Sequence, residues 1–344
     1  MFGEAPNIQE HEKIGVQDEH SSPFNRRVAW LLKSEQLQAK LSTMISDVQD
    51  GIEAISKSPQ GRTNPFESIY RLVFRMTLRM VGIEELAEDT ELRERFMHYF
   101  EMIDESATPA LVMFPRFPWP ALIKRYYAGT RLYMMIEDIG KKRRQSGKNP
   151  KDVDALQYLL ERGDGMQEIV FFITGALFAG QLNSGINAAM VLCYLASSPG
   201  WLARVRTEVQ KAASKYSPGK KTKDSPSLLE QLDALPLEAW EAEFPLIQMC
   251  LRDSIRLNLP GTFFRKNTSS EPIPTGHGDE MIPPGSFPVY HVTDVHMDPE
   301  VYSEPEKWDP SRYTAERAED KKTTHAYLGW GSGRHPCSKL PMTS

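Results

Sequence analysis

A single cysteine near the end of the chain, Cys337, lies in a stretch of glycines, basic residues and a proline, YLGWGSGRHPCSK. Gly329, Gly331 and Gly333 give the pattern G-x-G-x-G without the later glycine of a dinucleotide-binding loop. Ser332 lacks the preceding glycine of a nucleophile elbow, because Trp330 takes that position. No other cysteine or paired histidine has the spacing of a structural zinc site. The pattern therefore indicates a lone thiolate held by a tight loop.

Such a thiolate has the properties of an axial ligand to haem iron. A cysteine thiolate pushes electron density onto the iron and favours cleavage of the O–O bond. Backbone N–H groups and nearby basic side chains keep the sulfur of Cys337 deprotonated, and glycines allow the backbone to approach a flat ligand closely. The loop thus predicts Cys337 as a metal ligand.

The composition is that of a soluble, folded protein. Hydrophobic residues make up 40% of the 344 residues and charged residues 25%. The three cysteines are too few and too scattered for a disulfide framework, which favours a reducing compartment. A formal charge of −5 argues against a nucleic-acid partner, since nucleic-acid binders are usually basic.

Apolar residues recur at helical spacing over most of the chain, and this predicts a mainly α fold with a minor β region. Beyond Pro260 the pattern changes to short strands interrupted by proline and glycine. We expect one domain over residues 1–344, with a helical body over about 25–260 and a strand-containing and cysteine region over about 261–344. The expected helices cover about 25–58, 66–105, 121–144, 154–162, an uncharged segment after 169, and 237–259.

The uncharged segment runs from Ile169 to Ala203 and is long enough to span a membrane. Its middle carries Gln181 and Asn183, whose amides are costly in a bilayer, so a buried helix is the better interpretation. The basic run over residues 141–144 is interpreted as the solvated end of a helix.

The cysteine loop resembles the ligand loop of the cytochrome P450 family, F-x-x-G-x-R-x-C-x-G. Trp330 takes the place of the phenylalanine, Gly333 that of the glycine, and His335 that of the arginine. The sterol demethylase branch also has histidine there, so the resemblance is nearest to that branch. Lys339 replaces the last glycine, which is a departure from the pattern.

Two further segments support the resemblance. Asp253 and Arg256 lie where the family has E-x-x-R, and their i, i+3 spacing places both on one helix face. The segment WDPSRY resembles the one that supplies a second arginine, here Arg312. The resemblance implies that these three residues form a buried charged cluster that steadies the cysteine loop. His296, in an H-x-D-P match, is expected to be a structural hydrogen-bonding residue rather than a metal ligand.

The segment FAGQLNS resembles the central helix of the family, A-G-x-D/E-T-T/S. Gly180 would leave room for haem, and Asn183 and Ser184 are the candidates on the dioxygen side. Leu182 and Asn183 replace the acid and the threonine that relay protons in the family. By the same resemblance His335 and Arg265 would bind the haem propionates. The substrate pocket would be lined by Phe171, Thr174, Phe178, Thr262 and Phe263.

The resemblance implies a haem-thiolate monooxygenase that inserts one oxygen atom from O₂ into a lipophilic substrate such as a sterol or terpenoid. Electrons would come from NADPH through a separate flavoprotein reductase. A full-length protein would lie at the cytosolic face of the endoplasmic reticulum membrane, whereas this chain, which lacks the family's N-terminal anchor and the helix after Cys337, would be cytoplasmic. Two alternatives stay open: a haem-thiolate isomerase or dehydratase acting on peroxides, and a haem-free remnant that acts by binding protein.

Overall fold

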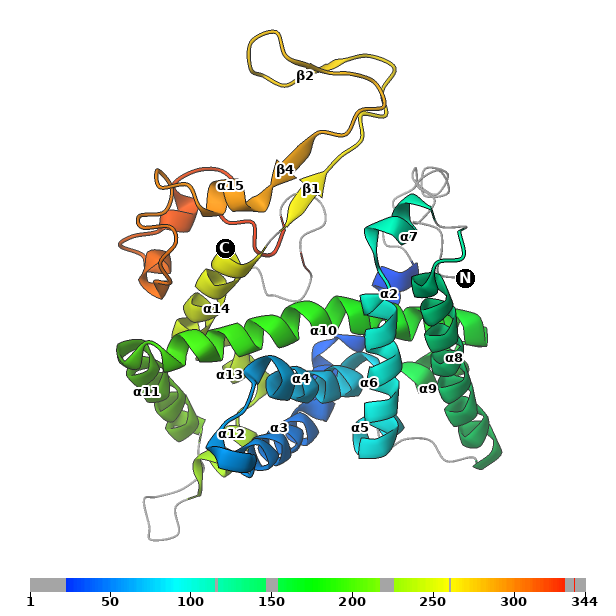
Figure 1. Cartoon of the computed structure of the whole chain (residues 1–344). Coiled ribbons are helices and arrows are strands. Elements are labelled where there is room, and N and C mark those ends of the chain that lie inside the picture. The colour runs from blue at the N-terminus through cyan, green and yellow to red at the C-terminus, as the bar shows by residue number, and fades with distance from the viewer. Residues whose placement is uncertain are drawn as a thin grey trace. The chain divides into compact units, whose positions relative to one another are not determined.

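The computed structural model describes residues 23–114, 117–146, 154–216, 226–259, 261–331 and 337 (Figure 1). The chain divides into two compact units, residues 1–186 and 187–344, and the division falls inside the long helix α10 (Met166–Ala196). The expected single domain stays a prediction. The expectation of a mainly helical protein with a small β region is confirmed.

The first unit is built from helices alone among its described residues. They are α2 (Pro23–Leu31), α3 (Ser34–Ser56), η1 (Pro59–Gly61), α4 (Pro65–Val81), α5 (Glu84–Glu88), α6 (Thr90–Glu105), α7 (Pro109–Met113), α8 (Pro120–Ser146), α9 (Ala155–Glu161) and the first part of α10. Their apolar faces form one core that includes Phe74, Phe96 and Phe100. Burial of such side chains is the main force that holds these amphipathic helices together.

Side-chain caps explain several breaks that helical periodicity alone does not show. The expected helix over 66–105 is interrupted at Gly82, and α6 then begins after Asp89, whose carboxylate accepts a hydrogen bond from Leu92 N at 2.9 Å. Asn64 caps α4 in the same way through Phe66 N, and Pro65 suits the first helical position. Three helices therefore stand where one periodic stretch was expected.

Helix α10 is long and apolar enough to cross a membrane by length and composition, with 56% of its most apolar window buried inside the protein. The polar side chain of Gln181 is fully buried within the first unit. Its Nε2 donates to the carbonyl of Tyr70 at 2.8 Å, and its Oε1 accepts from Thr77 Oγ1 at 3.2 Å. These two hydrogen bonds satisfy the buried amide of Gln181, which explains how this polar side chain is tolerated in the uncharged helix.

The interpretation of residues 141–144 as a fully solvated helix end was wrong for Arg143. This side chain is buried and donates to both carboxylate oxygens of Asp154, at 2.8 and 2.7 Å, and to Glu85. Burial opposes the charge of Arg143, but the hydrogen bonds that it donates to Asp154 and Glu85 raise its pKa. Asp154 also caps α9 by accepting from Gln157 N, so one carboxylate joins α5, α8 and α9.

The second unit holds the remaining helices and all the strands of the described residues (Figure 1). Strand β1 (Thr262–Phe264) pairs antiparallel with β4 (Val289–His291), and β2 (Ile273–Pro274) pairs with β3 (Met281–Ile282). The expected helix over 237–259 is two helices, because the chain breaks at Phe244 before Pro245. The other elements are α11 (Pro199–Tyr216), α12 (Leu228–Asp233), α13 (Leu237–Ala242), α14 (Pro245–Asn258), α15 (Val292–His296), η2 (Pro310–Tyr313) and η3 (Glu319–Lys321).

We expect Asp154→Ala to lower the free energy of unfolding by about 3 kcal/mol, because it leaves the buried Arg143 guanidinium short of a partner and removes a helix cap. Urea titration followed by circular dichroism measures the change. Asp138→Ala is the matched control, since Asp138 is exposed on α8, the helix that carries Arg143. Equal losses in the two variants would contradict this role of Asp154.

Candidate functional site

Cys337 is a free, exposed cysteine. Its backbone N–H donates to the carbonyl of Trp330 at 2.8 Å, which closes the loop onto its own start. Gly331 has a φ of +76°, a left-handed conformation that favours glycine. A side chain at Gly329 would come within 2.7 Å of the Ile255 side chain. The backbone conformation thus favours glycine at position 331 and the nearby side chains leave little space for a Cβ at position 329, whereas Gly333 and His335 lie outside the described residues.

The other two cysteines are poorly suited to act as a thiolate ligand. Cys250 is fully buried in α14, and this burial raises the pKa of its thiol to about 12. Cys193 is partly buried on α10. Within the described residues, no three His, Cys, Asp or Glu side chains are grouped as a metal site. Cys337 is therefore the most exposed of the three cysteines.

Asp253, Arg256 and Arg312 meet in the interior of the second unit. Asp253 and Arg256 lie on α14 and Arg312 on η2, and all three are at most 1% exposed. Arg256 Nε donates to Asp253 Oδ1 at 2.7 Å, and Arg312 Nε lies 3.8 Å from the same oxygen. The other oxygen, Oδ2, accepts from the backbone N–H of Asp309 at 2.6 Å. We name these three residues the charged cluster.

The two arginines of the charged cluster also bind a run of irregular backbone. Arg256 donates to the carbonyls of His296 at 2.8 Å, Pro305 at 2.6 Å and Lys307 at 3.2 Å. Arg312 donates to the carbonyls of Ser303, Glu304 and Lys307. Since buried carbonyls need donors, the guanidinium groups supply what a helix or sheet would supply elsewhere.

Glu319 is a member of this network that the sequence interpretation missed. It accepts from Arg312 Nη1 at 2.9 Å and from Arg317 Nη2 at 2.8 Å. Burial alone would raise the pKa of Glu319, but the hydrogen bonds from Arg317 and Arg312 lower it to about 2. The sequence signal that could have indicated Glu319 is charge balance, because two buried arginines that share Asp253 need a second acidic side chain.

His296 acts as a structural hydrogen-bonding residue, as expected. Its ring is fully buried, and its Nε2 accepts from the backbone N–H of Leu328 at 3.0 Å. Burial, together with the charge of Arg256, lowers the pKa of His296 to about 4, so the ring is neutral at pH 7. The acceptor fixes the backbone directly ahead of Gly329, where the cysteine loop begins.

The α10 candidates lie on two sides of the helix. Phe171, Thr174 and Phe178 line one pocket of about 270 Å³ in the first unit, together with residues of α6 and α8. Gly180 is buried, whereas Asn183 and Ser184 are exposed. The structure therefore brings the first three residues together in a cavity and places the dioxygen-side candidates at the surface of the described residues.

The remaining pocket and propionate candidates belong to the second unit. Thr262 is exposed on β1 and its hydroxyl is 3.1 Å from His291 Nδ1, while Phe263 is partly buried and pairs with Tyr290. Arg265 is exposed just beyond β1, and its side chain donates to the carbonyl of Phe264 at 2.8 Å.

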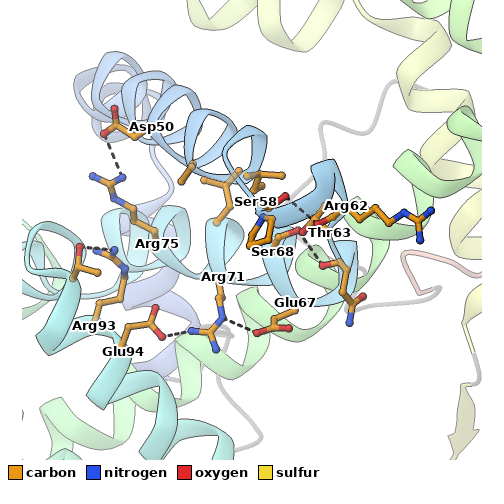
Figure 2. A pocket seen from close by; sticks show the side chains of 17 residues that line it. Asp50, Ser58, Arg62, Thr63, Glu67, Ser68, Arg71, Arg75, Arg93 and Glu94 are labelled. Atoms are coloured by element: carbon orange, nitrogen blue, oxygen red, sulfur yellow. Dashed lines mark hydrogen bonds and ion pairs between the residues drawn. The ribbon is translucent and has the colours of Figure 1, made fainter.

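A larger pocket of about 860 Å³ lies between α3, α4 and α6, and none of the expected site residues lines it (Figure 2). It contains several arginines with carboxylate partners. Arg71 pairs with Glu67 and Glu94, and Arg75 pairs with Asp50. Arg93, which also lines the pocket, donates to the Ala87 carbonyl and to Thr90 Oγ1 instead.

Asp253→Asn should lower the free energy of unfolding by about 3 kcal/mol or more, because two buried guanidinium groups then share a neutral side chain. Asp294→Asn on the exposed side of α15 is the control and should change it by about 0.5 kcal/mol at most. Urea unfolding measures both, and a loss at Asp253 no larger than the control would refute the importance of its charge.

The lowered pKa of His296 predicts an acid-sensitive fold. The unfolded chain binds a proton near pH 6.5 and the folded chain only near pH 4, so this stabilisation is complete above pH 6.5 and falls by about 3 kcal/mol between pH 6.5 and 4. In His296→Gln, which keeps an acceptor, the free energy of unfolding should lose that dependence. If the free energy of unfolding fell in parallel for the two proteins across this pH range, His296 would not be the source of the acid sensitivity.

The comparisons with known proteins agree with this arrangement. Residues 33–338 match the family model described as Cytochrome P450. The chain is 34% identical over 92% of its length to the cytochrome P450 monooxygenase AacuE of Aspergillus aculeatus, and 33% identical over 91% to nsrP of Aspergillus novofumigatus. A sterol 14-demethylase of Arabidopsis thaliana is 24% identical over 90% of the chain.

The chain spans 62% of AacuE and 59% of nsrP, about three fifths of these relatives. Its fold matches the retinoic-acid-bound cyanobacterial CYP120A1 with a TM-score of 0.68 at 21% identity, over 91% of this chain and 65% of that one. The match over residues 33–338 shows that the chain belongs to the cytochrome P450 family.

Proposed function

We propose that the protein is a haem-thiolate monooxygenase that inserts one oxygen atom from O₂ into a lipophilic substrate, with Cys337 as the axial ligand. The observation that carries this proposal is that Cys337 is a free, exposed cysteine in a loop in which Gly331 has a left-handed backbone conformation. Membership of the cytochrome P450 family supports the cofactor, haem.

The described residues around Cys337 fit such a group. An axial ligand needs an accessible sulfur, which Cys337 offers and the buried Cys250 does not. The backbone of the loop is held by the Trp330 carbonyl at one end and by His296 through Leu328 N–H at the other. These hydrogen bonds would hold the backbone on both sides of the loop when the Cys337 sulfur binds the iron.

When bound, the haem would supply dioxygen activation, and the other roles belong to residues of this chain. His335 and Arg265 would pair with the propionates, and the exposed guanidinium of Arg265 has no carboxylate within ion-pair distance among the described residues. Asn183, at the position of the family's threonine, and the adjacent Ser184 would hold a water that delivers protons in place of the missing acid.

Partners and location follow from the same proposal. We assign electron supply to a separate NADPH-dependent flavoprotein reductase and the substrate to lipophilic secondary metabolites, terpenoids or sterols. The whole protein would then lie on the cytosolic face of the endoplasmic reticulum membrane. AacuE and nsrP are both named cytochrome P450 monooxygenases, which supports a monooxygenase reaction in general terms.

A second candidate is a haem-thiolate isomerase or dehydratase that acts on peroxides. Leu182 and Asn183 favour it, because they replace the acid and threonine of the proton relay and a peroxide rearrangement needs no such relay. Supplying an organic hydroperoxide without any reductase separates the two. Rapid rearrangement of the peroxide would favour the isomerase, and slow decay would favour the monooxygenase.

Cys337→Ser should abolish the thiolate signature in the absorption spectrum of the reduced, carbon-monoxide-treated protein reconstituted with haemin. Cys193→Ser is the matched control and should keep the spectrum of the wild type, since Cys193 is partly buried on α10. An identical spectrum for Cys337→Ser and the wild type would refute the assignment. A wild-type chain that retains no haem would instead favour the haem-free remnant.

A further inference from the structure

The pocket of about 270 Å³ in the first unit combines aromatic walls with two hydrogen-bond donors that have no partner among the described residues. Phe171, Phe178 and Ile103 form apolar walls, and Arg125 and Thr174 also line the space. The ring of Phe178 stacks on that of Phe100 with centroids 4.1 Å apart, which holds this wall in place. Apolar walls with a few polar groups are typical of a small-molecule site.

Thr174 is the first of the two donors. Its side chain is only 4% exposed, and its Oγ1 has no hydrogen-bond partner among the described residues. A threonine inside a helix usually donates to the carbonyl four residues earlier. Other helical threonines of this chain do so at 2.8 or 2.9 Å, namely Thr77, Thr130 and Thr207. Thr174 instead keeps its hydroxyl available at the pocket wall.

Arg125 is the second donor and reaches the pocket from α8. Its Nε is buried without a hydrogen-bond partner, and no carboxylate of the described residues lies within ion-pair distance. Asp104 lines the same pocket but is exposed and forms no ion pair with Arg125. Thr174 Oγ1 and Arg125 Nε both lack an acceptor among the described residues, so a ligand oxygen that accepts hydrogen bonds would satisfy both donors.

We infer that this pocket selects an aromatic substrate that carries a carbonyl or carboxylate oxygen, which accepts hydrogen bonds from Thr174 Oγ1 and Arg125. The inference rests on the proposed monooxygenase function and narrows its substrate from any lipophilic molecule to an oxygenated aromatic one. A plain hydrocarbon would leave both buried donors unpaired. Sites built to bond a substrate oxygen discriminate strongly against analogues that lack it.

Equilibrium dialysis of the purified chain with three naphthalene probes tests this inference. The ketone 2-acetylnaphthalene should bind at least about 10-fold more tightly than 2-isopropylnaphthalene, which has a similar shape but no acceptor. The carboxylate 2-naphthoate should bind at least as tightly as the ketone, because Arg125 then adds its charge. Equal affinities for all three probes would overturn the inference.

Two variants test whether Thr174 and Arg125 cause the preference for the oxygen-bearing probes. Thr174→Val should weaken binding of the ketone about 5- to 10-fold, and Arg125→Met about 10-fold or more, while the affinity for 2-isopropylnaphthalene stays unchanged. Thr207→Val and Arg95→Met are the matched controls, since both residues lie outside this pocket. Circular dichroism verifies that each variant is folded. Unchanged ketone affinity in both variants, or an equal loss for ketone and hydrocarbon, would also overturn the inference.

The outcome is separate from that of the proposed function, because dialysis requires neither electron transfer nor turnover. If Cys337→Ser left the carbon monoxide spectrum unchanged, the thiolate assignment would fail while the probe preferences stood. If the preferences were absent but the spectrum depended on Cys337, only the assignment of the substrate class would fail.

Discussion

The sharing of one buried carboxylate by two buried guanidinium groups is the interaction on which the second unit depends. Taking Asp253, Arg256 and Arg312 out of water is costly, and it is tolerated only where nearly every donor and acceptor finds a partner. Here the arginines use backbone carbonyls and Glu319 as additional acceptors. A mutation at any of these positions therefore acts on several segments together.

This network matters most because the chain after β4 contains little regular structure. Between α15 and Cys337 the described elements are the short 3-10 helices η2 and η3, and no strand is present there within the described residues. The carbonyls that a sheet would satisfy are instead satisfied by Arg256 and Arg312 from two directions. His296 extends the same support to Leu328, and Leu328 precedes the glycines of the cysteine loop.

The sequence predicts the helical character of the chain and the short strands, because those follow from local periodicity and from proline and glycine positions. It also indicates the charged cluster, although this came from family resemblance rather than from spacing alone. It does not predict that Arg143 is buried against acidic partners, or that Glu319 accepts hydrogen bonds from Arg312. Arg143 pairs with Glu85, 58 residues away, and such a long-range partner leaves no local pattern.

The proposed substrate pocket likewise combines residues that a local sequence pattern reveals with a residue that no local pattern reveals. Thr174 and Phe178 share one helix and are recognised together, but Arg125 comes from a different helix and carries no motif. The helix breaks at Gly82 and Phe244 depend on caps and on Pro245, which periodicity overlooks. The positions of His335 and Gly333 lie outside the described residues, so their roles stay predictions.

The charged cluster holds the backbone that leads to Cys337, through His296 and Leu328, and amide hydrogen exchange measures this restraint. Asp253→Asn should speed exchange at Leu328 and Gly331, whose N–H groups are bonded in the wild type, by at least about 10-fold, equivalent to about 1.4 kcal/mol of local stability. Amides of α4 in the first unit should keep their rates. Unchanged exchange at Leu328 and Gly331 would contradict the account.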